Sequence, residues 1–173
     1  MRKWVVVPLT AAVLVGACGR DVQPEATAGP TSWDPCSITP EAIAATGLDP
    51  TYRDEGWGEG IIVEDWEICT FKPLGVSVPY FLAVKSSVTQ TFADVRRDSL
   101  EFEPRDVALG GRDAFTYRRV MGRSAVACNI AVDLPPGVVV FTVNYVKEDE
   151  SDPCAIALTH ATDLQSALPV AVK

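Results

Sequence analysis

A run of alternating residues in the last third of the chain constrains the fold most. Apolar side chains occupy every second position from 126 to 134, and the run ends in Pro135-Pro136-Gly137. The next nine residues, 138–146, are rich in Val, Phe and Tyr. Because side chains alternate between the two faces of a strand, this pattern predicts two half-buried strands joined as a hairpin. The fold therefore contains an antiparallel sheet.

Three further segments favour strands. Val76 to Lys85 shows the same alternation, and Trp66 to Lys72 and Asp113 to Arg119 are also expected to form strands, the latter after the turn Gly110-Gly111. Pro79 lies inside the first of these segments. Since proline cannot donate a ladder hydrogen bond, we expect that strand to lie at an edge or to carry a bulge.

Helices are expected on either side of the strands. Thr39-Pro40-Glu41 and Asp152-Pro153-Cys154 each combine a capping side chain with a proline suited to the first helical turn. The first helix should run from Pro40 to Thr46, and a weaker central helix from Thr91 to Ser99. The last helix carries Ile156, Leu164 and Leu168 on one face. The order predicts one α+β domain, an antiparallel sheet of about five strands with N- and C-terminal flanking helices.

The N-terminus has the layout of an export signal. Arg2 and Lys3 precede an uncharged stretch to Ala17, which is too short to span a bilayer. Val15-Gly16-Ala17-Cys18 resembles the bacterial lipobox, in which Cys18 would receive a diacylglycerol; an ordinary cleaved signal is the alternative. We therefore predict a signal peptide at 1–17, a lipidated cysteine and flexible tether at 18–32, and a folded domain at 33–173.

The cysteine count agrees with this interpretation. Apart from Cys18 the chain holds an even number of cysteines, Cys36, Cys69, Cys128 and Cys154. Four reduced thiols or a zinc site are alternatives, but no C-x2-C pair is present. In an exported chain two disulfides are expected. We favour pairing 36 with 69 and 128 with 154, which would pin each terminal helix to the sheet; pairing 36 with 154 stays open.

The overall charge bears on partners. The chain has 15 basic and 23 acidic residues and a sequence pI near 4.6. Nucleic-acid binding requires a basic surface that neutralises phosphates. Nucleic acids are therefore poor candidate partners.

Several short motifs together carry a family resemblance. They are Trp33-Asp34-Pro35-Cys36, Cys69-Thr70-Phe71, residues 107–114, residues 128–132 and the closing Asp152-Pro153-Cys154. With the lipobox, they resemble the small cell-envelope lipoproteins of actinobacteria that are classed as a domain of unknown function. The resemblance covers nearly the whole mature chain and implies an envelope lipoprotein without an assigned activity. It brings no catalytic residues.

Catalytic motifs are scarce. His160 is the only histidine and lies on the apolar stripe of the last helix, where a partly buried histidine bonded to a carbonyl or carboxylate is expected rather than a catalytic base. Gly122-Arg123-Ser124 begins like a nucleophile elbow but lacks the second glycine. No nucleotide-binding or zinc-hydrolase motif occurs. We expect no enzyme activity, no metal and no cofactor.

One segment has the composition of a binding site. Residues 52–66 combine glycines and acids with two of the four tryptophans, and the candidate residues are Trp57, Glu59, Asp65 and Trp66. Such a segment could stack on sugar rings or hold a cationic peptide. The alternative is a solvated loop with a tryptophan tucked into the sheet.

Three functions follow as hypotheses. The first is a non-catalytic binding domain, lipid-anchored on the outer face of the cell membrane, with an envelope protein, a glycan or a lipid as its partner. The second is a carrier with a largely apolar cavity for a small hydrophobic ligand. The third is a carbohydrate-active hydrolase, in which Glu59 or Asp65 would face another carboxylate across a groove.

Overall fold

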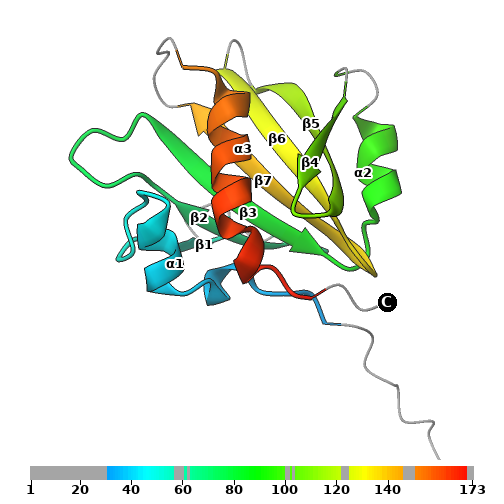
Figure 1. The fold of residues 1–173 in the computed structure, drawn as a ribbon, viewed down its shortest axis with the longest axis horizontal. Coiled ribbons are helices and arrows are strands. Elements are labelled where there is room, and N and C mark those ends of the chain that lie inside the picture. The colour runs from blue at the N-terminus through cyan, green and yellow to red at the C-terminus, as the bar shows by residue number, and fades with distance from the viewer. Residues whose placement is uncertain are drawn as a thin grey trace, which may run out of the picture.

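The computed structural model describes residues 31–56, 61, 63–99, 102, 104–121, 125–145 and 151–170. Its centre is a seven-stranded antiparallel sheet with the order β1-β2-β3-β7-β6-β5-β4. The helical elements are η1 (Pro35–Ser37), α1 (Pro40–Ala45), α2 (Phe92–Asp98), α3 (Pro153–Leu164) and η3 (Gln165–Ala167). The strands are β1 (Asp54–Glu55), β2 (Glu67–Phe71), β3 (Tyr80–Ser87), β4 (Arg105–Leu109), β5 (Arg112–Met121), β6 (Ala125–Leu134) and β7 (Gly137–Tyr145). The predicted α+β class agrees with this architecture (Figure 1).

The expected strand count of about five was too low. β1 has only two residues, which is too few to produce a pattern. β4 forms a hairpin with β5 through the predicted turn, in which Gly110 and Gly111 have φ values of 56° and 79°. This left-handed conformation suits the two-residue turns that match strand twist. The segment before the turn was missed because most of its side chains are partly or fully exposed.

The prediction for Pro79 was wrong. β3 begins at Tyr80, directly after the proline, and lies inside the sheet between β2 and β7. No ladder hydrogen bond is lost because Pro79 precedes the first paired residue. Val76, expected in the strand, lies in the preceding loop and is fully exposed.

The predicted hairpin of β6 and β7 is confirmed. Leu134 pairs with Gly137 across a two-residue turn, in which the Pro135-Pro136 peptide bond is cis. A Cβ atom at Gly137 would lie 1.7 Å from the backbone oxygen of Ser87, so only glycine fits where β7 begins beside the end of β3. This close approach lets β7 pair with β3, and that pairing joins β1–β3 to the other four strands.

The helix starts also match the sequence analysis. Thr39 caps α1 by accepting a hydrogen bond from the Ala42 backbone N–H at 3.3 Å, and Asp152 caps α3 by accepting one from Cys154 at 3.1 Å. α2, expected to be weak, has a capping box between Thr91 and Asp94.

Two disulfides join helical segments to the sheet. Cys36 after Pro35 pairs with Cys69 in β2, and Cys128 in β6 pairs with Cys154 in α3. This is the pairing that the sequence analysis favoured over 36 with 154. Each bridge closes a loop of 33 or 26 positions and contributes about 3–4 kcal/mol on the chain-entropy model.

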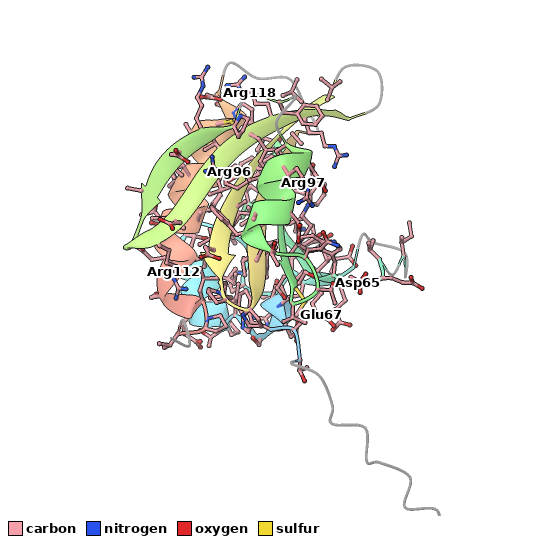
Figure 2. All side chains as sticks on the ribbon, turned by 90° about the vertical axis from the view of Figure 1, so that its right-hand side faces the viewer. Asp65, Glu67, Arg96, Arg97, Arg112 and Arg118 are labelled. Carbon is pink, nitrogen blue, oxygen red and sulfur yellow. A yellow bond between two sulfur atoms is a disulfide. The ribbon has the colours of Figure 1, made fainter. Side chains whose placement is uncertain are left out.

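The helices divide between the two faces of the sheet (Figure 2). α3 and α1 cover one face, where Phe141, Leu82 and Leu164 belong to the larger core. α2 lies on the opposite face over a smaller core around Phe115 and Val140. α2 therefore covers only part of this face, and the candidate site lies beside it.

Candidate functional site

The principal candidate site is a cleft of about 370 Å³ beside α2. It lies on the second face of the sheet, between α2 and the segment that precedes β2. The described residues that line it are Val63, Trp66, Ile68, Lys85, Gln90, Val95, Asp98, Ser99, Phe102, Tyr117, Arg119 and Val140. We call this feature the α2 cleft.

A row of paired residues crosses the sheet beneath the α2 cleft. Ile68 pairs with Lys85, Lys85 with Val140, Val140 with Ala131, and Ala131 with Phe115. Residues directly opposite one another in antiparallel strands share a face, so these five side chains form one row. Lys85 is the single charged member of an otherwise apolar row. Its position places a cation at the floor of the cleft.

Two cations and two aromatic rings flank the α2 cleft. The Lys85 ammonium lies 5.8 Å from the centroid of the Trp66 ring, and the Arg119 guanidinium lies 5.9 Å from the centroid of the Phe102 ring. Both separations fall within the range of cation–π contacts. Trp66 and Lys85 come from the β2 side of the face, whereas Phe102 and Arg119 come from the β5 side.

The electrostatics of the α2 cleft follow from these positions. Burial, and secondarily the nearby Arg119 guanidinium, lower the pKa of Lys85 to about 8. Burial also raises the pKa of the Tyr117 hydroxyl. Asp98 is the one acid among the described lining residues; it is exposed and its carboxylate lies 3.9 Å from Arg97. Among the described lining residues, the two cations Lys85 and Arg119 therefore outnumber the single acid Asp98.

The four candidate binding residues have different outcomes. Trp66 lines the α2 cleft and packs against the smaller core, so it contributes to both the site and the fold. Asp65 is exposed in a turn with φ of 68° and does not line the cleft; it lies below α2 with Glu67 in Figure 2. Trp57 and Glu59 lie outside the described residues, as do Cys18 and Gly122-Arg123-Ser124.

A second cleft of about 440 Å³ adjoins the first. It shares Val63, Trp66 and Ile68 with the α2 cleft and carries Asp34, Glu55 and Glu67. Trp66 therefore lines both the cleft that contains Lys85 and Arg119 and the cleft that contains Asp34, Glu55 and Glu67. The described residues contain no group of three or more His, Cys, Asp or Glu side chains placed to bind a metal ion.

Sequence reasoning missed most of the α2 cleft. Lys85 was noted only as the polar member of an alternating strand, and Arg119 as the end of another. The available signal was the set of neighbours of Lys85 on the same face of its strand. These neighbours are Phe81, Ala83 and Ser87, and they suggest that this face is covered. The partners in the other strands could not be known without the sheet order.

His160 lies on the opposite face and was placed correctly on the buried side of α3. Its Nε2 atom lies 2.7 Å from the Tyr80 hydroxyl, so its partner is a phenol and not the expected carbonyl or carboxylate. Burial lowers the pKa of His160, and Asp163 partly opposes that shift. His160 is buried and Tyr80 packs against the larger core, and neither residue lines the two clefts described above.

Comparison with known families gives a match over most of the chain. Residues 13–166 match the model of the family described as "Protein of unknown function (DUF3558)". The chain belongs to this family. The search of curated proteins and the search of solved structures gave no match for this DUF3558 chain. In the part of the DUF3558 chain that the structure describes, no helix is long and apolar enough to cross a membrane.

Proposed function

We propose that this DUF3558 protein is an exported, lipid-anchored binding domain of the cell envelope and that its ligand binds in the α2 cleft. The observation that carries the binding role is the cleft itself, with Trp66 at its wall and no catalytic constellation among its described lining residues. The volume of about 370 Å³ falls in the range of small-molecule sites, roughly 300–1,000 Å³.

The anchor rests on the sequence. The motif Val15-Gly16-Ala17-Cys18 follows an uncharged stretch behind two basic residues. Two disulfides support an oxidising compartment, since such bonds persist outside the cytosol. Ser86 in β3 donates a hydrogen bond to the Trp33 carbonyl, so the segment that follows the tether is fixed to the strand that carries Lys85. The acyl chains at Cys18 would then hold the cleft near the membrane surface.

The other two hypotheses receive less support. A carrier of a lipid requires a largely apolar cavity, whereas Lys85, Gln90, Asp98, Ser99 and Arg119 line the α2 cleft. A carbohydrate hydrolase requires two facing carboxylates, and the described lining of the α2 cleft contains only Asp98. The acids of the second cleft, Asp34, Glu55 and Glu67, are all exposed to solvent, whereas the general acid of such an enzyme needs a partly buried site that raises its pKa. The proposed role is therefore non-catalytic.

The anchor is tested by Cys18→Ser in a bacterial host that processes lipoproteins. The variant should move from the detergent-soluble membrane fraction to the soluble exported fraction, because only Cys18 can accept the diacylglycerol. As a control, Cys36→Ser combined with Cys69→Ser removes a disulfide but keeps Cys18. This double variant should stay with the membrane. Retention of Cys18→Ser in the membrane fraction would refute the anchor.

The binding role is tested with N-phenylnaphthylamine, a neutral dye whose fluorescence rises in an apolar site. The soluble domain should bind about one dye per chain, and Trp66→Ala should weaken binding by about tenfold, because a stacked aromatic wall is lost. Val76→Ala, at a fully exposed loop residue, should bind as the wild type does. A wild-type domain that fails to bind, or a Trp66→Ala variant that binds equally well, would contradict the cleft as the site.

A further inference from the structure

The loop between β2 and β3, residues 73–79, presents apolar side chains to solvent. Leu74 is 59% exposed and Val76 is fully exposed. The sequence from Pro73 to Val84 contains no charged residue, although 22% of the whole chain is charged. An apolar side chain that is surrounded by water gains free energy when another apolar phase covers it. The loop therefore has the properties of a contact surface.

The base of this loop is fixed to the domain. Pro73 forms an isolated bridge with Leu48, and the Leu74 backbone N–H donates a hydrogen bond to the Gly47 carbonyl at 3.3 Å. The two strands that the loop connects are paired directly behind it, from Phe71 with Leu82 onward. Figure 1 shows the loop projecting from the sheet beside α1. The exposed tip is therefore held at a fixed place on the surface of the domain.

The side chains at the base of the loop suit the boundary between lipid and water. The Lys72 ammonium lies 4.7 Å from the centroid of the Tyr52 ring and 4.0 Å from the Asp49 carboxylate. The Tyr52 ring centroid lies 6.3 Å from that of Phe81 in β3. Tyrosine and lysine are favoured near the headgroups of a bilayer, because each combines an apolar body with a polar end. The surface is thus apolar at the tip and aromatic and polar at the base.

The shape of the loop favours a lipid surface over a second protein. A specific protein interface buries about 800 Å² of each partner. Two apolar side chains at the tip of a projecting loop supply only a small part of such an area. A fluid bilayer can enclose a projecting tip on every side, and interfacial segments reach about 5–10 Å into the boundary between headgroups and acyl chains. The proposed anchor at Cys18 would keep a bilayer close to the loop at all times.

The tether is long enough for this contact. Ser86 donates a hydrogen bond to the Trp33 carbonyl, so the tether leaves the domain near the end of β3 that lies away from the loop. Tyr80 and Ser86 are six positions apart in the strand, which is about 20 Å at about 3.3 Å per residue. Cys18 and Trp33 are 15 positions apart, and an extended chain of that length spans about 50 Å. The anchor and the loop can therefore reach the same membrane even when β3 stands upright on it.

We infer that the tip of the 73–79 loop, with Leu74 and Val76, inserts into the surface of the bilayer that carries the anchor. The domain then has two membrane contacts, the acyl chains at Cys18 and this loop, and the second contact limits its orientation on the membrane. This inference rests on the proposed anchor and adds a second lipid contact to it.

Hydrogen exchange of the anchored domain tests the inference. A purified chain of residues 18–173 has one free thiol, Cys18, because its other four cysteines form disulfides. Coupling Cys18 to a maleimide lipid in phosphatidylcholine vesicles supplies an anchor without lipoprotein-processing enzymes. The amides of residues 74–78 should then exchange about tenfold more slowly than in the same chain capped with a soluble maleimide, because the bilayer excludes water from them. Phosphatidylcholine has no net charge, so the acidic balance of the chain does not oppose the contact.

Matched variants assign the protection to the apolar tip. Val76→Asp places a carboxylate at the tip and should abolish the protection, because a charged group loses its hydration on entering lipid. Val120→Asp makes the same change at a valine of β5 that is 63% exposed, and it should leave the protection intact. Both side chains are exposed, so both variants should unfold in urea at the midpoint of the wild type.

The outcomes distinguish the loop from the anchor. Equal exchange rates in the coupled and capped chains, as expected of a loop that binds a protein, would overturn insertion. Protection that survives Val76→Asp would overturn it as well. Either result would leave the anchor intact, because the fractionation of Cys18→Ser tests the anchor by itself. Retention of Cys18→Ser in the membrane fraction would overturn both.

Discussion

The two faces of the sheet are built differently. On the α3 face, α3 is joined to β6 by the Cys128–Cys154 disulfide, and Phe141 and Leu164 are almost completely buried. On the α2 face, the seven-residue helix α2 has no disulfide and covers only part of the strands. The α2 cleft lies in the remaining part.

In this small domain, most of the stability and the proposed binding site therefore belong to different faces of the sheet. A closed apolar face supplies most of the burial free energy, because that energy scales with the apolar area removed from water. The opposite face then tolerates a half-buried lysine and an open cleft. Binding sites often lower the stability of a domain in this way, because side chains suited to contact a ligand are poorly suited to a packed core.

The largest expected effect compares two phenylalanines that are both fully buried, Phe141 on the α3 face and Phe115 on the α2 face. Phe141→Ala should lower the free energy of unfolding by about 3–5 kcal/mol, because the helix above it is held by a disulfide and cannot fill the cavity. Phe115→Ala should cost less, since α2 and the Phe92 ring can move toward the space. Urea unfolding of the oxidised domain measures both. Equal losses would show that the two faces are equally rigid.

Local features of the fold could be predicted from the sequence, whereas features that depend on long-range strand pairing could not. Helix starts at Thr39 and Asp152 depend on neighbouring residues, so local patterns identified them. The pairing of β3 with β7 joins segments far apart in the chain, and no local pattern encodes it. Alternation in β3 shows that Lys85 lies on the face of the strand opposite the apolar residues of the larger core. It does not show that α2 covers part of the face that carries Lys85. The α2 cleft therefore appeared only with the sheet order.

A smaller effect concerns the stability cost of Lys85. The pKa of Lys85 is about 8 in the folded state against an ordinary 10.5, so the unfolded state binds more protons between these values. The free energy of unfolding should therefore rise with pH from about 8 toward 10, by an amount on the order of 1 kcal/mol after allowance for partial exposure.

The Lys85→Met variant should lack this rise. Lys72→Met, outside the cleft, should keep the rise. Urea midpoints across this pH range provide the measurement. A Lys85→Met protein that unfolds much more easily at neutral pH would show that Lys85 supports the fold, and the separation between the two faces would then be less complete.

The smallest expected effect concerns His160, a buried histidine on the α3 face. His160 is 4% exposed, and its Nδ1 atom has no hydrogen-bond partner within the described part of the chain. Tyr80 in β3 and Asp163 in α3 are the groups that bear on its protonation. Because burial lowers the pKa of His160 below its usual 6.5, the unfolded state binds its proton first as pH falls. Stability should therefore be complete above pH 6.5 and decline below it.

Replacement of His160 by glutamine keeps a polar side chain near Tyr80 and removes the titration. The variant should lose the decline that begins just below pH 6.5, while any loss caused by carboxylates at lower pH remains. The effect should be smaller than that at Lys85, because Asp163 offsets part of the burial cost. If wild type and variant follow the same curve through this range, water reaches His160 in the folded state, and the α3 face is less closed than the contrast with the α2 face requires.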